Sequence, residues 1–335
     1  MRLFPALLAT PFALLCFGQQ TTIRTTVPLV VLPASVTDTN GHFVYGLRAS
    51  DFLVLDNGEP RPVRVDDPDA AVAPLALLVL IQTSDLSRSA LLKIKKVGSM
   101  IPEAVAGANG EAAIVTFSDE VKIVQDFTNN ADSISDTFHD LKVADSGKGR
   151  MIDAAGKALD MLAERPKAAR SAIVIIGESK DRGSSGKLND LLSRIQESRA
   201  TVYLLSYSAY LTAFTTRGSE YEPPDSGGLL SAITETARLG RKSAAEILTT
   251  ATGGRILKFE TKSKLENDLI RLGSEIHSRY IISFTPKADA RASFHAVEVK
   301  IKNRPELAVR TRPGYWSGTQ PRKNEQIQKW RWPPK

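Results

Sequence analysis

The stretch LALLVLIQTSDLSRS, residues Leu75–Ser89, decides the fold of this 335-residue chain. Its first seven residues are apolar without alternation, which predicts a strand buried on both faces of a sheet. A polar loop rich in hydroxyl side chains follows, and a helical pattern starts at about Ser87. In an open α/β sheet, ligands bind at loops beyond the carboxyl ends of the strands. We therefore expect a functional site between Gln82 and Ser89.

The same alternation of strand and helix continues from residue 74 to residue 277. Strands are expected at 75–81, 112–117, 121–127, 172–176, 201–205 and 256–259, and helices at 87–105, 132–141, 151–163, 188–198, 244–250 and 264–277. The helix near 244–250 should stop at Gly253, and residues 206–228 should form a long loop. This order predicts a doubly wound, mainly parallel sheet in which 121–127 is an antiparallel edge strand.

Both flanks of this region, residues 19–72 and 279–316, predict β structure. Asn40-Gly41 and Asn57-Gly58 are hairpin-type turn signals. Strands are expected at 29–31, 34–37, 42–45, 52–55, 63–65, 280–284, 297–301 and 307–312, with Pro28 and Pro33 favouring an edge position for the first of them. Neither flank has enough strands for a sandwich alone. The predicted fold class is therefore α/β, with the doubly wound domain (74–277) inserted in a β-sandwich-like domain built from both flanks.

The amino-terminal segment predicts export. Residues 1–18 have Arg2 followed by a short apolar run, as in a signal peptide, and no later apolar run is long enough for a transmembrane segment. The one cysteine, Cys16, follows the bulky Leu15, so lipoprotein attachment is not expected. Residues 317–335 form a basic tail that we expect to be disordered. We expect a secreted or periplasmic protein without disulfides.

Charge and motifs narrow the classes of function. Residues 319–335 carry five basic residues and one acidic residue, a net +4 of the chain's +7, so the folded part is only mildly basic and nucleic acid is not an expected partner. The four histidines are scattered, and neither Gly-x-Ser-x-Gly nor His-Glu-x-x-His occurs. Residues 183–188 lack the leading glycine and the hydroxyl of a phosphate loop. The sequence therefore does not predict an enzyme.

Six phrases give the chain a family resemblance. They are VTDTNG (36–41), DFLVLDNG (51–58), VTFSDEV (115–121), QDF (125–127), ATGG (251–254) and RPGY (312–315). Together with the opening strand and loop, they resemble von Willebrand factor A (VWFA)-related proteins of the acidobacterial type. The resemblance covers the chain from the early β strands to RPGY. It implies a von Willebrand A-type fold for residues 74–277 and a site at the carboxyl end of its sheet.

The metal-ion-dependent adhesion site of that family takes an Asp and two Ser from the first loop, a Thr from the second and an Asp from the third. These oxygen donors suit the octahedral shell of Mg²⁺. At the matching positions this chain has Gln82, Ser84, Leu86, Gly149 and Glu178. One hydroxyl and a longer carboxylate remain, so the resemblance implies a degenerate site. We expect no cofactor, with weak Mg²⁺ or Mn²⁺ binding as the alternative.

A second alignment of the first loop with the family's Asp-x-Ser-x-Ser motif, called the second register below, leaves metal binding open. Asp85-Leu-Ser87-Arg-Ser89 is literally Asp-x-Ser-x-Ser, but it begins four residues after Ile81, where the apolar run ends. Asp and Ser at the start of a helix are also ordinary capping residues. The sequence thus allows a metal site through Asp85, Ser87 and Ser89, or helix capping by the same residues. Asp181, in the third loop, could assist such a metal site.

We expect a non-enzymatic protein-binding module that docks its partner through the loops at the carboxyl end of the sheet. The candidate binding residues come from all three loops: Gln82, Ser84, Asp85, Ser87, Lys148, Arg150, Glu178 and Asp181. Lys148, Arg150, Lys180 and Arg182 favour an acidic partner. Two alternatives remain: a structural envelope protein in which the A-type domain is a spacer, and metal-dependent adhesion through the second register.

Overall fold

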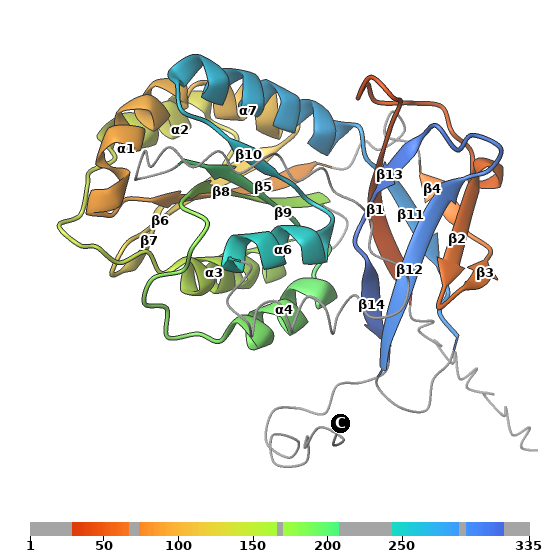
Figure 1. Ribbon diagram of the computed structural model, residues 1–335. Coiled ribbons are helices and arrows are strands. Elements are labelled where there is room, and N and C mark those ends of the chain that lie inside the picture. Colours follow the sequence, from red (N-terminus) through yellow and green to blue (C-terminus); the bar gives the residue numbers. More distant parts are fainter. Residues whose placement is uncertain (1–28, 67–73, 166–169, 208–242, 288–292, 318–335) are drawn as a thin grey trace, which may run out of the picture.

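The computed structural model describes residues 29–66, 74–165, 170–207, 243–287 and 293–317, which form an α/β domain and a β domain (Figure 1). The expected loop at 206–228 and the ends of the chain lie almost entirely outside these ranges.

The α/β domain is built on a six-stranded sheet with the strand order β10-β9-β8-β5-β6-β7. Its strands are parallel except the edge strand β7, which runs antiparallel to β6. The bounds are β5 (Leu75–Gln82), β6 (Glu111–Phe117), β7 (Val121–Thr128), β8 (Arg170–Gly177), β9 (Thr201–Ser206) and β10 (Ile256–Lys258). The predicted sheet, including its antiparallel edge, is confirmed.

Strand β5 lies in the middle of this sheet, and all eight of its residues are buried. Its odd-numbered side chains, such as Leu77 and Val79, belong to one apolar core, and Leu78 and Leu80 belong to the other. Helices on both faces explain why the run has no polar alternation. One face carries α1 (Arg88–Ile94), α2 (Ala131–Asp140) and α7 (Lys262–His277), and the other carries α3 (Met151–Ala163), α4 (Leu188–Glu197) and α6 (Ala244–Thr252) (Figure 1).

The single helix expected at 87–105 is wrong. The segment forms 3-10 turns at Asp85–Ser87 and Lys95–Val97, the short helix α1, and a π-helical turn at Ile101–Ala106. A Cβ atom on Gly98 would lie 2.3 Å from the Cβ of Phe138, so the chain passes unusually close to α2. Pro102, which has no N–H, then enters the π-helical turn. These tertiary contacts override the helical periodicity.

The β domain consists of two four-stranded sheets with the orders β13-β1-β11-β4 and β14-β12-β2-β3. The first contains β1 (Val30–Thr37), β4 (Arg64–Asp66), β11 (Tyr280–Phe284) and β13 (Ala308–Arg310), and the second contains β2 (Phe52–Asp56), β3 (Glu59–Arg61), β12 (Ser293–Ile301) and β14 (Gly314–Ser317). Each sheet mixes strands from before and after the α/β domain. The predicted fold class, an α/β domain inserted in a sandwich-like β domain, is confirmed.

Two expectations for the first flank are wrong. Residues 29–31 and 34–37 do not form an edge strand, because β1 runs through Pro33 and lies between β13 and β11. Pro33 is tolerated because it precedes the part of β1, Ser35–Thr37, that pairs with β13. Residues 42–45 form an isolated bridge between Phe43 and Thr37 rather than a strand. The turn at Asn57-Gly58 is present, with φ of 52° and 83°.

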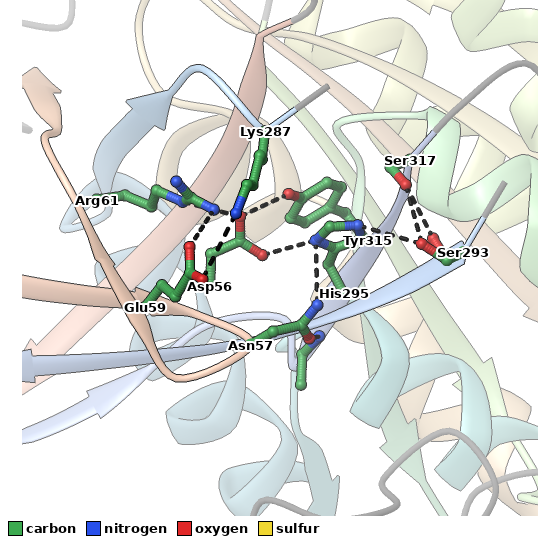
Figure 2. A network of polar contacts seen from close by, with 10 residues as sticks. Asp56, Asn57, Glu59, Arg61, Lys287, Ser293, His295, Tyr315 and Ser317 are labelled. Atoms are coloured by element: carbon green, nitrogen blue, oxygen red, sulfur yellow. Dashed lines mark hydrogen bonds and ion pairs between the residues drawn. The ribbon is translucent and has the colours of Figure 1, made fainter. Parts of the chain in front are cut away.

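A buried polar network joins the four strands of the second sheet (Figure 2). The carboxylate of Asp56, at the end of β2, accepts from Tyr315 Oη at 3.0 Å and from Arg61 Nε at 3.1 Å. His295 Nδ1 lies 2.8 Å from the other oxygen of Asp56, and His295 Nε2 lies 3.3 Å from Ser293 Oγ. The Tyr315 ring stacks on the imidazole at 4.9 Å. Because the Asp56 side chain is fully buried, this network fixes how β2, β3, β12 and β14 meet.

Two buried arginines fasten the β domain to the α/β domain. Arg312 donates to the carbonyl of Gln196 in α4 at 2.9 Å and to the carbonyl of Val31 in β1. Arg279 donates to Thr201 Oγ1 at 2.8 Å and to the carbonyl of Gly253 at 2.6 Å. These contacts lie at the start of β9 and the ends of α4 and α6. The β domain therefore packs at the amino ends of the strands, away from the described carboxyl-end loops.

Candidate functional site

Three loops meet at the carboxyl ends of the strands and are joined by backbone hydrogen bonds. The first loop follows β5, the second precedes α3, and the third follows β8. Asp85 N donates to Ser146 O at 2.9 Å, and Ala144 N donates to Thr83 O at 2.7 Å. Gly149 and Arg182 exchange two hydrogen bonds, of 2.9 and 3.0 Å, in an antiparallel bridge. The three loops that the sequence predicts as a site are thus brought together.

Gln82 lies beneath these loops and connects two of them. Its side chain is buried, and Nε2 donates to Ser84 Oγ at 2.9 Å within the first loop. Its Oε1 accepts from the backbone N–H of Glu178 in the third loop at 2.8 Å. The primary amide therefore uses both its donor and its acceptor in buried contacts.

A chain of buried hydroxyls continues from Gln82. Ser84 Oγ lies 3.4 Å from Ser87 Oγ, which accepts from Tyr207 Oη at 2.7 Å. Burial raises the pKa of Tyr207, which keeps its hydroxyl a donor. The second hydroxyl beside Ser84 is thus Ser87 rather than the residue at Leu86, because the 3-10 turn at Asp85–Ser87 turns Ser87 inward. Tyr207, at the end of β9, was not among the residues expected from the sequence.

The strand order decides the fold family of this domain. A central β5 lies between parallel β8 and β6, helices cover both faces, and the antiparallel β7 forms one edge. The α/β domain has the von Willebrand factor A-type fold. The assignment agrees with the resemblance of the loop after β5, and it rests on the topology of the chain itself.

Three solved structures show a distant likeness to this chain. BatB from Bacteroides thetaiotaomicron is 12% identical over 60% of this chain and 98% of that chain, with a TM-score of 0.43. The SpRpn10 VWA domain is 14% identical over 59% and 94%, with a TM-score of 0.39. A von Willebrand factor type A protein from Catenulispora acidiphila is 10% identical over 84% and 71%, with a TM-score of 0.43. No protein-family model and no curated protein matches the chain.

The donors at the A-type site do not fit a divalent cation. Mg²⁺ needs several hard oxygen ligands, usually including a carboxylate. Here the buried group consists of an amide and two hydroxyls, while the carboxylate of Glu178 accepts from Arg182 Nε at 3.2 Å. Within the described ranges, no cluster of three His, Cys, Asp or Glu side chains could hold a metal.

The literal motif Asp85-x-Ser87-x-Ser89 does not converge on one point. The carboxylate of Asp85 accepts from Arg88 at 2.7 Å, at the protein surface. Ser87 is buried beside Ser84, whereas Ser89 is exposed on α1. The side chains of Ser84 and Ser87 make no capping hydrogen bond either. In the structure these residues therefore form neither a cation shell nor a side-chain cap.

Arg150 and two aspartates support the second and third loops. Arg150 donates to Asp153, to the carbonyl of Asp119 and to Ser185 Oγ, at 2.7–3.0 Å. Asp153 also accepts from the N–H groups of Ser185 and Gly186. These two amides of the 183–188 segment therefore bind a carboxylate of the chain itself. Burial raises the pKa of Asp153, but these N–H groups and Arg150 outweigh it and lower the pKa overall.

Asp181 completes this support by accepting from Ile152 N at 2.9 Å and from Ser184 Oγ at 2.6 Å. The sequence places Arg150 and Asp181 at the site, but their contacts are internal to the loops. The arginine–aspartate spacing of three residues at the start of α3 is the signal that could have indicated the role of Asp153.

Three of the cations that face solvent on these loops are Lys148, Lys180 and Arg182. The stem of Lys148 lies against Gly183, where an added Cβ would be 3.4 Å from Lys148 Cδ. Arg182 is held by its bond to Glu178 and by the backbone bridge to Gly149. The loop surface therefore carries positive charge on an ordered backbone. None of the described helices is long and apolar enough to cross a membrane.

Proposed function

We propose that this chain is an extracytoplasmic protein-binding module. Its A-type domain docks a partner through the three carboxyl-end loops without a metal ion, and its β domain is a rigid mount. The observation that carries the proposal is the set of exposed cations, Lys148, Lys180 and Arg182, on loops that hydrogen bonds hold together. A surface ordered before binding loses less conformational freedom when a partner docks.

The charge of this surface favours an acidic partner. Carboxylates of a partner would meet the ammonium groups of Lys148 and Lys180 at the rim, where opposite charge raises the rate of association and selects the partner. Arg182 adds a guanidinium whose Nε is already engaged by Glu178. The β domain attaches at the opposite end of the sheet, through Arg312 and Arg279.

Charge reversal tests this surface. We expect the double variant Lys148→Glu/Lys180→Glu to bind a fluorescent peptide of about ten glutamates at least about tenfold more weakly than the unchanged protein, because two attractive charges become repulsive. Fluorescence anisotropy at low salt measures the dissociation constant. The matched control is Lys96→Glu/Lys302→Glu, which changes net charge equally at exposed positions outside the loops. Equal losses in both variants would contradict the proposal.

Arg150→Glu is a poorer probe of contact with a partner. The Arg150 side chain is engaged by Asp153, Asp119 and Ser185, so reversing its charge would disturb the loops themselves. Lost binding in that variant would not show whether Arg150 contacts the partner or only supports the loops.

One observation favours a second candidate function, hydrolysis. Ser293, His295 and Asp56 align as hydroxyl, imidazole and carboxylate, with distances of 3.3 and 2.8 Å (Figure 2). This order of groups activates serine for acyl transfer in serine hydrolases. A surface cavity of about 580 Å³ lies on the outer side of β1, β4 and β11, and these three residues do not line it. Binding therefore remains the first candidate.

A fluorophosphonate reagent separates the two candidates. In hydrolysis-type chemistry, Ser293 Oγ forms a bond to phosphorus, fluoride leaves, and the hydroxyl proton passes to His295 Nε2. The hydrolytic candidate requires labelling of Ser293 that is lost in His295→Gln and kept in Ser317→Ala. We expect no labelling of the folded protein, which would retire that candidate.

A further inference from the structure

The structure assigns to Gln82 the place and the structural task that a metal ion has in A-type domains with a complete motif. This inference rests on the proposed function only for its consequence, that partner binding is indifferent to divalent cations. It concerns a side chain that is fully inside the protein, and it can be tested without any partner.

The contacts of Gln82 are those of a cross-link. Its Nε2 donates to Ser84 Oγ of the first loop, and its Oε1 accepts from the backbone N–H of Glu178 in the third loop. Ser84 then leads to Ser87 and Tyr207, which brings in the end of β9. A bound cation would join the same loops through oxygen ligands. Here one neutral amide joins them by hydrogen bonds.

Two glycines provide the space that this amide occupies. A Cβ on Gly149, in the second loop, would lie 2.8 Å from Gln82 Nε2. A Cβ on Gly177, at the end of β8, would lie 2.9 Å from Gln82 Oε1. Both distances are shorter than van der Waals contact, so any larger residue would displace the amide. The glycine at 149, where the family has threonine, is thus accounted for by Gln82.

The neutral charge of the buried Gln82 amide agrees with this assignment. Gln82 is neutral and both ends of its amide are satisfied, so the buried group needs no counter-ion. An aspartate at position 82 would instead place a negative charge beside Ser84 and Ser87, and its shorter side chain would leave room near Gly149. That combination of a carboxylate, two hydroxyls and free space favours a hard divalent cation.

A pair of variants tests the assignment. Gln82→Ala and Gln82→Asp both remove the amide, and only the second adds a carboxylate. We expect both to melt at least about 5 °C below the unchanged protein in EDTA, because a buried cross-link is lost. We expect millimolar Mn²⁺ to raise the melting temperature of Gln82→Asp only. The unchanged protein should melt at the same temperature in EDTA and in Mn²⁺.

Hydrogen exchange gives a local readout that does not depend on melting. The N–H of Glu178 donates to Gln82 Oε1, so its exchange should be at least about tenfold faster in Gln82→Ala. Unchanged exchange there, a Gln82→Asp variant that Mn²⁺ does not stabilise, or stabilisation of the unchanged protein by Mn²⁺ would each overturn the inference. Glutamate-peptide binding by the lysine variants tests the docking surface independently of these measurements. Either proposal can therefore fail while the other stands.

Discussion

Arg312→Ala should lower the free energy of unfolding by about 3–5 kcal/mol, because two hydrogen bonds from a charged group are lost, one of them buried and the other partly buried. Arg312 is 8% exposed and joins Gln196 O in one domain to Val31 O in the other. Burial, with a smaller effect of Arg199, lowers the pKa of Arg312 to about 10, so the guanidinium stays charged at neutral pH.

Urea denaturation measures this effect, and Arg304→Ala is its control. Arg304 is an exposed arginine whose Nε lies 3.4 Å from Glu306, so its loss should cost less than about 1 kcal/mol. A cost for Arg312→Ala as small as that of the control would show that Arg312 does not fasten the domains together.

Asp56→Ala should destabilise the β domain by a similar amount, about 3–5 kcal/mol, because it removes the acceptor of a buried charged network. Tyr315, Arg61 and His295 would all lose their common partner. The matched control is Glu59→Ala, since Glu59 also pairs with Arg61 but is 57% exposed. That pair should contribute about 0–1 kcal/mol.

Chemical denaturation of the two variants under the same conditions measures the difference. We expect the stability of Asp56→Asn to lie between those of Asp56→Ala and the unchanged protein, because the amide keeps one acceptor oxygen but loses the charge and the second acceptor oxygen. Equal stabilities of the Asp56→Ala and Glu59→Ala variants would contradict a structural role for the buried network.

The junction between the domains changes how the spacer alternative is tested. A truncation to residues 74–277 would remove Arg279 and Arg312 and would leave Glu275 buried with Arg255 as its remaining described ion-pair partner. Such a fragment would lose stability for reasons unrelated to partner binding. The lysine variants of the full chain separate a binding module from a structural envelope protein more cleanly, because they leave the junction intact.

Features that depend on neighbouring residues were predictable from the sequence. The unbroken apolar run of β5 predicts burial on both faces, and Asn57-Gly58 predicts the hairpin turn that the positive φ angles require. Gly253 ends α6 in the left-handed conformation, with a φ of 70°. In each case the chemistry of a few adjacent residues restricts the backbone strongly enough to fix the local structure.

Features that depend on distant contacts were not predictable. The break in the expected helix at 87–105 follows from the close approach of Gly98 to Phe138, and the partners of Asp56 and Arg312 lie far away along the chain. At the candidate site, the sequence singles out Gln82 but cannot show that Gly149 of the second loop and Gly177 at the end of β8 lie against its amide. The sequence shows which residue types the loops contain, whereas the direction of each side chain depends on the tertiary structure.

Calorimetric titration of the purified protein with Mn²⁺ and Mg²⁺, repeated on Asp85→Ala, tests most directly the claim that the A-type site works without a metal ion. We predict no saturable heat for either ion in either protein, because Gln82 fills the site and Asp85 is paired with Arg88. Saturable binding of one ion per chain that disappears in Asp85→Ala would contradict the account and would make metal-dependent adhesion through Asp85, Ser87 and Ser89 the leading mechanism.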